Sequence, residues 1–267
     1  MQVGEVRKIT IGNSLRDATV KNISVCEISG KKNLLVEYEV QGYGETQAYL
    51  VDATDKLYGN ADARMERSLM PAQFFGKLSK DFDWTLYGEP MDVQKRIANA
   101  FVTQYAEFEK AGKGLYIFSK TKGSGKTFLA CVIANEIIKC KPYSVKFISA
   151  ADFVMLVKSK REEDMQCLES LYQCRLLIFD DIGTQDEKQG WINEALFRLI
   201  DYRSREKRPI IFTSNVVIDE IREERISDRI GAMCLPLKMP EQKVRRQLAD
   251  RQNREFLQSV LNPAFGV

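Results

Sequence analysis

The sequence contains no histidine, and none of its six cysteines stands in a Cys-x-x-Cys pair. These two absences exclude histidine-dependent catalytic triads, histidine general bases and zinc fingers of the usual spacing. We expect the cysteines to be small buried residues in a reducing compartment rather than partners in disulfide bonds.

Long apolar runs are also lacking. No stretch approaches the roughly 18 residues that a membrane-spanning helix needs, and the first ten residues have no apolar segment typical of a secretory signal. We therefore expect a cytoplasmic protein without a membrane partner. The net charge is only +3 over 267 residues, so any contact with nucleic acid has to come from a local patch.

The first part of the chain has a β pattern. β-Branched residues and alternating polarity recur through residues 1–53, and two such runs, 33–40 and 45–51, flank a glycine-bearing turn typical of a hairpin. Residues 54–95 have no clean period, and they are interpreted as a short helix within a connecting segment. A helix over 91–110 is expected to lead into the next domain.

From Gly114 onward, short apolar runs alternate with helical patterns. This alternation predicts an α/β domain whose parallel sheet is covered on both faces by helices. The expected strands are 114–119, 145–149, 176–180, 210–214 and 233–237. The expected helices between them are 126–139, 151–158 and 191–203.

The segment 114–130, GLYIFSKTKGSGKTFLA, has the pattern of a phosphate-binding loop between a strand and a helix. Glycines allow backbone amides to wrap around phosphates, and the helix N-terminus adds oriented donors. Lys126 is expected to reach the β- and γ-phosphates of ATP, and the Thr127 hydroxyl to ligate Mg²⁺. The residues expected to hold the nucleotide are Gly123, Ser124, Gly125, Lys126, Thr127 and Phe128.

This loop departs from the usual pattern at one position. The motif G-x-x-x-x-G-K-[ST] begins with a glycine, and this sequence has Lys120 there. The change is expected to lower nucleotide affinity, although Lys120 and Lys122 also raise the local positive potential.

Acidic and polar residues follow two of the expected strands. Asp180 and Asp181 come directly after the apolar run 176–179, and Asn215 follows the run 210–214. In an open parallel sheet, ligands bind at the carboxyl ends of the strands. We therefore expect Asp180 to hold Mg²⁺, Asp181 to polarise the attacking water, and Asn215 to contact the γ-phosphate or that water.

These motifs, in their order and spacing, resemble those of AAA+ ATPases. The set KTKGSGKT, LLIFDDIG, IIFTSN and RISDRI is most similar to the DnaC/DnaI group of replicative helicase loaders and to the related IstB transposition ATPases. The resemblance covers about residues 70–255. It implies a RecA-like core with strand order 5-1-4-3-2, so that residues 96–267 form an AAA+ domain with a minimal C-terminal helix.

The resemblance also implies roles for two arginines and for Asn215, which matches sensor 1. Arg229 matches the arginine finger, with Arg225 as a less favoured choice, and Arg245 matches the sensor 2 arginine, with Arg246 remaining open. Asp181 stands where most AAA+ proteins have glutamate, which suggests slow hydrolysis. A finger that acts in trans implies self-association into a ring or spiral.

The function implied by the resemblance is ATP-dependent loading of a replicative helicase onto single-stranded DNA. Two alternatives remain: an IstB-like transposition helper, and a nucleotide-gated adaptor with little turnover. The basic segments 198–208 and 238–254 are candidates for DNA contact, although mixed-charge solvated helices explain them as well. The module at 1–53 is expected to bind a partner.

Overall fold

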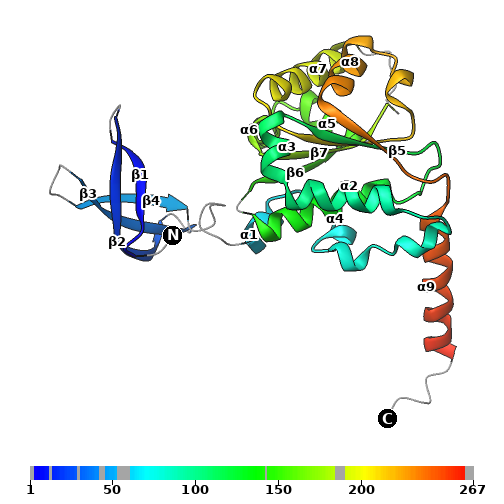
Figure 1. Ribbon diagram of the computed structural model, residues 1–267, viewed down its shortest axis with the longest axis horizontal. Helices are drawn as coiled ribbons and strands as arrows, with labels where there is room; N and C mark the ends of the chain where they lie inside the picture. The colour runs from blue at the N-terminus through cyan, green and yellow to red at the C-terminus, as the bar shows by residue number, and fades with distance from the viewer. Residues whose placement is uncertain are drawn as a thin grey trace. The chain divides into compact units, whose positions relative to one another are not determined.

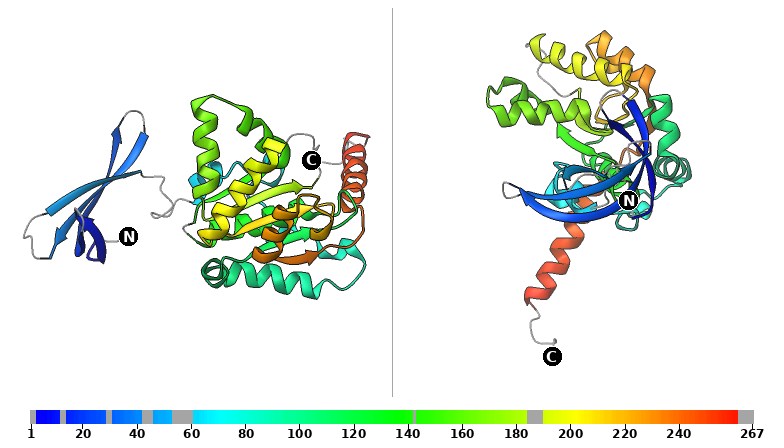
Figure 2. Two further views of the ribbon diagram at one scale, coloured as in Figure 1. Left: turned by 90° about the horizontal axis from the view of Figure 1, so that it is seen from above. Right: turned by 90° about the vertical axis from the view of Figure 1, so that its left-hand side faces the viewer.

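A computed structural model describes residues 3–11, 14–28, 31–41, 46–52, 61–141, 143–183 and 190–261. The chain divides into two compact units, Met1–Arg64 and Met65–Val267. Both are drawn in Figure 1, and further views are given in Figure 2.

The first unit is an antiparallel sheet whose strands lie in sequence order. They are β1 Val6–Ile11, β2 Ser14–Ile28, β3 Lys31–Val40 and β4 Thr46–Asp52. The prediction of a small β-rich module is confirmed, as is the pairing of β3 with β4; the turn residues 42–45 lie outside the described residues. Its small core contains Ala18, Val20, Val36, Tyr38 and Val40.

The second unit contains a five-stranded sheet in which all neighbouring strands pair in parallel. Its strands are β5 Gly114–Phe118, β6 Val145–Ser149, β7 Leu176–Ile182, β8 Ile210–Ser214 and β9 Cys234–Lys238. They lie in the order β6-β7-β8-β5-β9, which is the expected order 5-1-4-3-2 seen from the other edge. The helices are α1 Ala61–Glu66, α2 Asp92–Thr103, α3 Tyr105–Ala111, α4 Lys126–Cys140, α5 Ala150–Lys158, α6 Glu162–Gln173, α7 Gly190–Arg205, α8 Glu224–Met233 and α9 Val244–Leu261.

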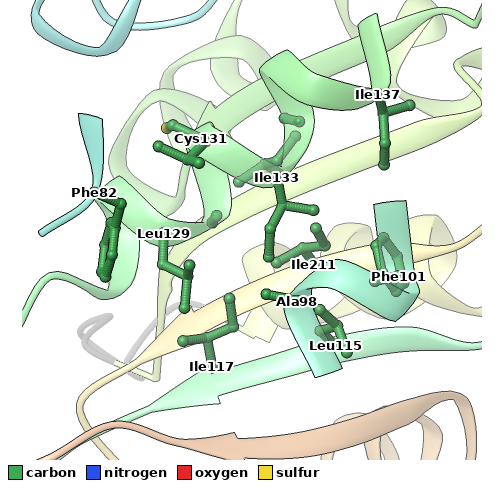
Figure 3. Close-up of a cluster of buried hydrophobic side chains, with 14 of the residues drawn as sticks. Phe82, Ala98, Phe101, Leu115, Ile117, Leu129, Cys131, Ile133, Ile137 and Ile211 are labelled. Carbon is green, nitrogen blue, oxygen red and sulfur yellow. The ribbon is translucent and has the colours of Figure 1, made fainter. Parts of the chain in front are cut away.

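Helices cover both faces of this sheet because its strands are apolar on both faces. Successive strand residues point to opposite faces. In β5, Leu115 and Ile117 pack with α2 and α4, whereas Tyr116 packs with α5, α7 and α8 on the other face. Figure 3 shows the first of these clusters, in which Leu129, Ile133 and Ile137 of α4 meet Leu115, Ile117 and Ile211 of the sheet.

The segment between Met65 and Met91 packs against α4. A helix on a domain surface normally buries a single stripe, but 10 of the 15 residues of α4 are buried. One side of α4 packs on the sheet, and the other side is covered by this segment. The segment contains the short 3₁₀ helices Ala72–Phe74, Ser79–Asp81 and Trp84–Tyr87. Asn135 of α4 donates to the carbonyls of Phe74 and Lys77, at 2.8 Å each.

Two details of the expected layout differ in the structure. The segment expected only to connect, 54–95, lies partly inside the second unit, since Met65 and Met91 belong to its core. The single helix expected over 91–110 is two helices, α2 and α3, separated at Gln104. The break turns Tyr105 into the core, where it is fully buried and donates to the Arg175 carbonyl at 2.9 Å.

Arg203 is a structural residue rather than part of a DNA surface. It belongs to the basic segment 198–208, yet it is fully buried in α7. Its guanidinium donates to the carbonyls of Leu171 at 2.7 Å, Cys174 at 2.9 Å and Pro209 at 2.8 Å. A buried cation is tolerated where hydrogen bonds replace part of its lost hydration. Arg203 thereby joins the end of α6 to the start of β8.

Among the helices of the described residues, none is both long enough and apolar enough to span a membrane.

Candidate functional site

The phosphate loop leaves β5 at Phe118 and enters α4 at Lys126. Gly123 and Gly125 have φ angles of 80° and 89°, in the left-handed region that favours glycine. Gly125 also has no room for a side chain, because a Cβ there would lie 2.5 Å from the Tyr87 hydroxyl. That hydroxyl donates to the Ser124 carbonyl at 2.9 Å. The segment 65–91 therefore packs directly against the loop, through Tyr87 at Ser124 and Gly125.

Lys126 is nearly buried, and its ammonium group points back into the loop. It donates to the carbonyls of Ser119 at 3.2 Å and Thr121 at 3.1 Å, and to the Ser124 hydroxyl at 3.2 Å. A fourth bond, 2.9 Å long, goes to the side-chain oxygen of Asn215. Burial lowers the pKa of Lys126, and the carboxylates of Asp181, Glu241 and Asp180 oppose that shift.

A β-bulge presents the two aspartates at the end of β7. The pairing with β8 shifts between Phe179 and Ile182, so Asp180 and Asp181 both lie opposite one residue, Thr213. Asp181 has a φ of 64°, which is unusual for a non-glycine residue. The Thr213 hydroxyl donates to Asp180 at 2.6 Å and accepts from the Asp181 amide at 2.9 Å. Thr213 thus holds the bulge in shape.

Asn215 joins the loop to the aspartates. Its side-chain amide donates to Asp181 Oδ1 at 2.7 Å, while its oxygen accepts from Lys126. Lys126, Asn215 and Asp181 therefore form one hydrogen-bonded chain across the site. The three residues come from α4, the end of β8 and the end of β7, as expected for a site at the carboxyl ends of parallel strands.

Asp180 and Thr127 suit a hard divalent cation. Burial raises the pKa of Asp180, and hydrogen bonds from the side chains of Thr213 and Thr127 oppose this rise. A carboxylate and a hydroxyl are oxygen ligands of the type that Mg²⁺ takes, together with waters and substrate phosphates. These two residues therefore fit the expected metal, with Thr127 at the start of α4.

The loop and the aspartates line one cleft of about 650 Å³. Every residue from Lys122 to Phe128 contributes to its wall, as do Asp180, Asp181 and Asn215. The lining also includes the apolar residues Phe74, Phe82, Leu86, Tyr87, Val244 and Leu248. The cleft therefore combines polar groups suited to phosphates with apolar side chains suited to a planar base.

The expected arginines divide between this cleft and the surface. Arg245, in the first turn of α9, lines the cleft, and its amide donates to the Gly123 carbonyl at 2.9 Å. Arg229 lies on α8 outside the cleft lining, is half-exposed, and pairs with Asp201 at 3.0 Å. Arg225 stacks on the Phe197 ring at 4.8 Å and pairs with Glu223 at 3.0 Å. Arg246 is outside the cleft lining.

Thr213 and Tyr87 were not expected at the site. A threonine within an apolar strand does not predict that a bulge will lie opposite it. The position of Thr213 two residues before Asn215 was the one available signal. Tyr87 lies in a segment without periodicity, 39 positions before Lys126, so only the fold brings it under the loop.

Comparison with known proteins identifies the family. Residues 60–231 match the model of the IstB-like ATP binding protein family. Among curated proteins, the replicative helicase loader DnaI of Bacillus subtilis is 32% identical over 124 residues, which cover 46% of this chain and 39% of that protein. The replicative helicase loader DnaC of Escherichia coli K12 is 31% identical over 134 residues, covering 48% of this chain and 54% of that protein. The matches thus span about half or less of either loader.

Solved structures show the same fold. A crystal structure of DnaI is 26% identical with a TM-score of 0.55, covering 64% of this chain and 95% of that one. A crystal structure of the DnaC helicase loader is 19% identical with a TM-score of 0.55, and the match covers 64% of this chain and 100% of that one. AMPPCP-bound DnaA from Aquifex aeolicus shares the fold. It is 18% identical with a TM-score of 0.52, and the match covers 70% of this chain and 56% of that one. Since the family model matches well over half of its residues, this chain belongs to the IstB-like ATP-binding proteins, with the RecA-like core of AAA+ ATPases.

Proposed function

We propose that this protein is an ATP-dependent loader that places a replicative helicase on single-stranded DNA. The observation that carries the proposal is the cleft of about 650 Å³, whose lining brings together the loop residues Lys122 to Phe128, the two aspartates and Asn215. The helicase part of the proposal is supported by the relatives DnaI and DnaC, both named replicative helicase loaders.

The residues of the cleft have separate tasks in this proposal. Lys126 exchanges its contact with Asn215 for the β- and γ-phosphates, which lie against the amides of the loop. Thr127 and Asp180 would hold Mg²⁺, which would neutralise charge on the phosphates. Asn215, no longer bonded to Lys126, is then available with Asp181 to orient the attacking water.

Arg229 is proposed to act on a neighbouring subunit. It lies outside its own cleft lining and is 47% exposed, so a second copy that binds head to tail can receive it. An arginine supplied in trans stabilises charge on the transferred phosphoryl group. Such contacts build a ring or an open spiral. Arg245 is proposed to contact the nucleotide within its own subunit.

The single-stranded DNA part of the proposal is supported by Trp191 at the start of α7. Its indole is 42% exposed, and the Lys158 ammonium lies 5.5 Å from the ring centre. An exposed aromatic ring beside a cation is suited to stacking a base next to its phosphate.

Replacing Trp191 with alanine is expected to weaken binding of single-stranded DNA about tenfold, since stacking on one aromatic side chain is worth about 1–3 kcal/mol per base. Fluorescence anisotropy with a labelled oligonucleotide measures this change. Trp191→Phe keeps an aromatic face and should retain most of the affinity. Equal affinity of Trp191→Ala and the unchanged protein would show that DNA does not bind at this residue.

The partner is tested with the full chain, the purified replicative helicase of the same organism and closed circular single-stranded DNA. We expect Mg-ATP with this protein to increase the amount of helicase bound to the circles, and omission of ATP to remove the increase. If the helicase is neither bound nor loaded, the helicase assignment is wrong.

Two other functions have some support. The family model is that of IstB-like proteins, which favours a transposition helper; co-purification of a transposase in place of the helicase would identify it. The adaptor alternative is supported by Lys120 and by the left-handed backbone of Asp181. ATP hydrolysis that rises with single-stranded DNA would exclude an adaptor with little turnover.

A further inference from the structure

The connection between β9 and α9, residues 239–243, is bound to the beginning of the phosphate loop. Met239 donates its amide to the Phe118 carbonyl at 2.8 Å, where the loop begins. Gln242 donates its side-chain amide to the Tyr87 carbonyl. Glu241 lies between these residues, and its carboxylate faces the loop.

The Glu241 carboxylate receives hydrogen bonds from three consecutive loop residues. The amides of Lys120 and Thr121 donate to it at 3.0 Å and 2.6 Å, and the Ser119 hydroxyl donates at 3.1 Å. Bonds to an ionised acceptor are stronger than neutral ones. Although burial acts to raise it, the net pKa of Glu241 lies below its usual value because of these bonds.

This contact holds the part of the loop at which the glycine of the common motif is replaced. Lys120 is not among the positive-φ residues of the described chain, so its backbone does not require glycine. Its ammonium is held by Glu220 at 2.8 Å, which keeps the side chain away from the loop. The replacement is therefore compatible with the loop, and the Lys120 amide is satisfied by Glu241.

Glu241 acts from outside the cleft. Neither Glu241 nor residues 119–121 belong to the cleft lining, to which the loop contributes only from Lys122 onward. The carboxylate therefore leaves the phosphate-facing amides to a ligand. Lys126 holds the same stretch from the other side through the carbonyls of Ser119 and Thr121. The stretch 119–121 is therefore held from two sides, by Lys126 and by Glu241.

We propose that Glu241 is a positioning residue of the phosphate site, which fixes the first half of the loop and joins it to α9. The proposal rests on the nucleotide-binding function proposed above. It predicts that the loop is less ordered without the Glu241 carboxylate, and that nucleotide binding then has to order it. The effect should appear in affinity and KM more than in kcat, because Glu241 does not touch the reacting groups.

The test uses Glu241→Gln and Glu241→Ala in the full chain, with Glu220→Gln as the matched control that removes only the Lys120 ammonium contact. Without nucleotide, hydrogen exchange of the Lys120 and Thr121 amides should be about tenfold faster in the Glu241 variants, as expected for the loss of a hydrogen bond to a charged group. Glu220→Gln should exchange like the unchanged protein.

Calorimetry with Mg-ADP gives the second readout. Both Glu241 variants should bind about tenfold more weakly, whereas Glu220→Gln should stay within about twofold of the unchanged protein. Unchanged exchange and affinity in both Glu241 variants would overturn the proposal. If the unchanged protein binds no nucleotide, the proposed function fails, while the exchange experiment still tests whether Glu241 holds the loop.

Discussion

Replacing Lys126 with alanine is expected to weaken binding of Mg-ATP at least about a hundredfold and to abolish hydrolysis. The ammonium group has four acceptors within hydrogen-bond distance and is proposed to donate two or more bonds to the phosphates. Each hydrogen bond to a charged group contributes about 1.5–3 kcal/mol, and about 1.4 kcal/mol corresponds to a factor of ten. Calorimetry and a phosphate-release assay measure the two effects.

The matched control is Lys139→Ala, which removes an exposed lysine from the last turn of the same helix. This variant should bind and hydrolyse ATP like the unchanged protein. Lys126→Ala also removes the cation beside Asp180 and Asp181, so its folding should be checked by circular dichroism. A folded Lys126→Ala variant that still binds Mg-ATP tightly would refute the assignment of the cleft.

Replacing Arg229 with alanine is expected to lower kcat about a thousandfold while nucleotide affinity changes little. The estimate follows from the effect of arginine fingers in other phosphoryl-transfer enzymes. Affinity should be largely kept because Arg229 lies outside the cleft of its own subunit. The measurement is steady-state hydrolysis at a protein concentration that permits assembly. Arg225→Ala is the control, since Arg225 is held on the Phe197 ring.

Mixing the two inactive variants provides a sharper test of action in trans. An Arg229→Ala subunit keeps its Lys126, and a neighbouring Lys126→Ala subunit keeps its Arg229, so one interface of a mixed pair is complete. The mixture should therefore recover part of the activity that each variant lacks alone. Absence of any recovery would show that Arg229 does not act on a neighbouring subunit. Loss of activity in Arg225→Ala, with Arg229→Ala still active, would assign the role to Arg225.

The spacing of residues predicted much of the second unit. Strands of four or five apolar residues, each followed by polar groups, are local signals, and they placed the phosphate loop, the two aspartates and Asn215 at one edge of a parallel sheet. The strand order came from the resemblance to AAA+ proteins, and the structure confirms it.

The remaining features depend on contacts between distant residues. Arg203 looked like one of several solvated charges, because its burial depends on carbonyls of Leu171 in α6 and Pro209 before β8 that meet only in the fold. The left-handed backbone of Asp181 arises from the bulge opposite Thr213, and two adjacent aspartates do not by themselves predict it. Glu241 lies 120 positions after Thr121, and no motif joins them.

The C-terminal helix reaches from the cleft to the outside of the second unit. Its first turns, including Val244, Arg245 and Leu248, form part of the cleft wall, and its other end stands away from the sheet (Figure 1). At about 1.5 Å per residue, its 18 residues extend about 27 Å. If α9 rotates by about 10° about its first turn, Leu261 moves by about 5 Å. A small change beside the nucleotide would therefore produce a much larger displacement at the far end of this helix.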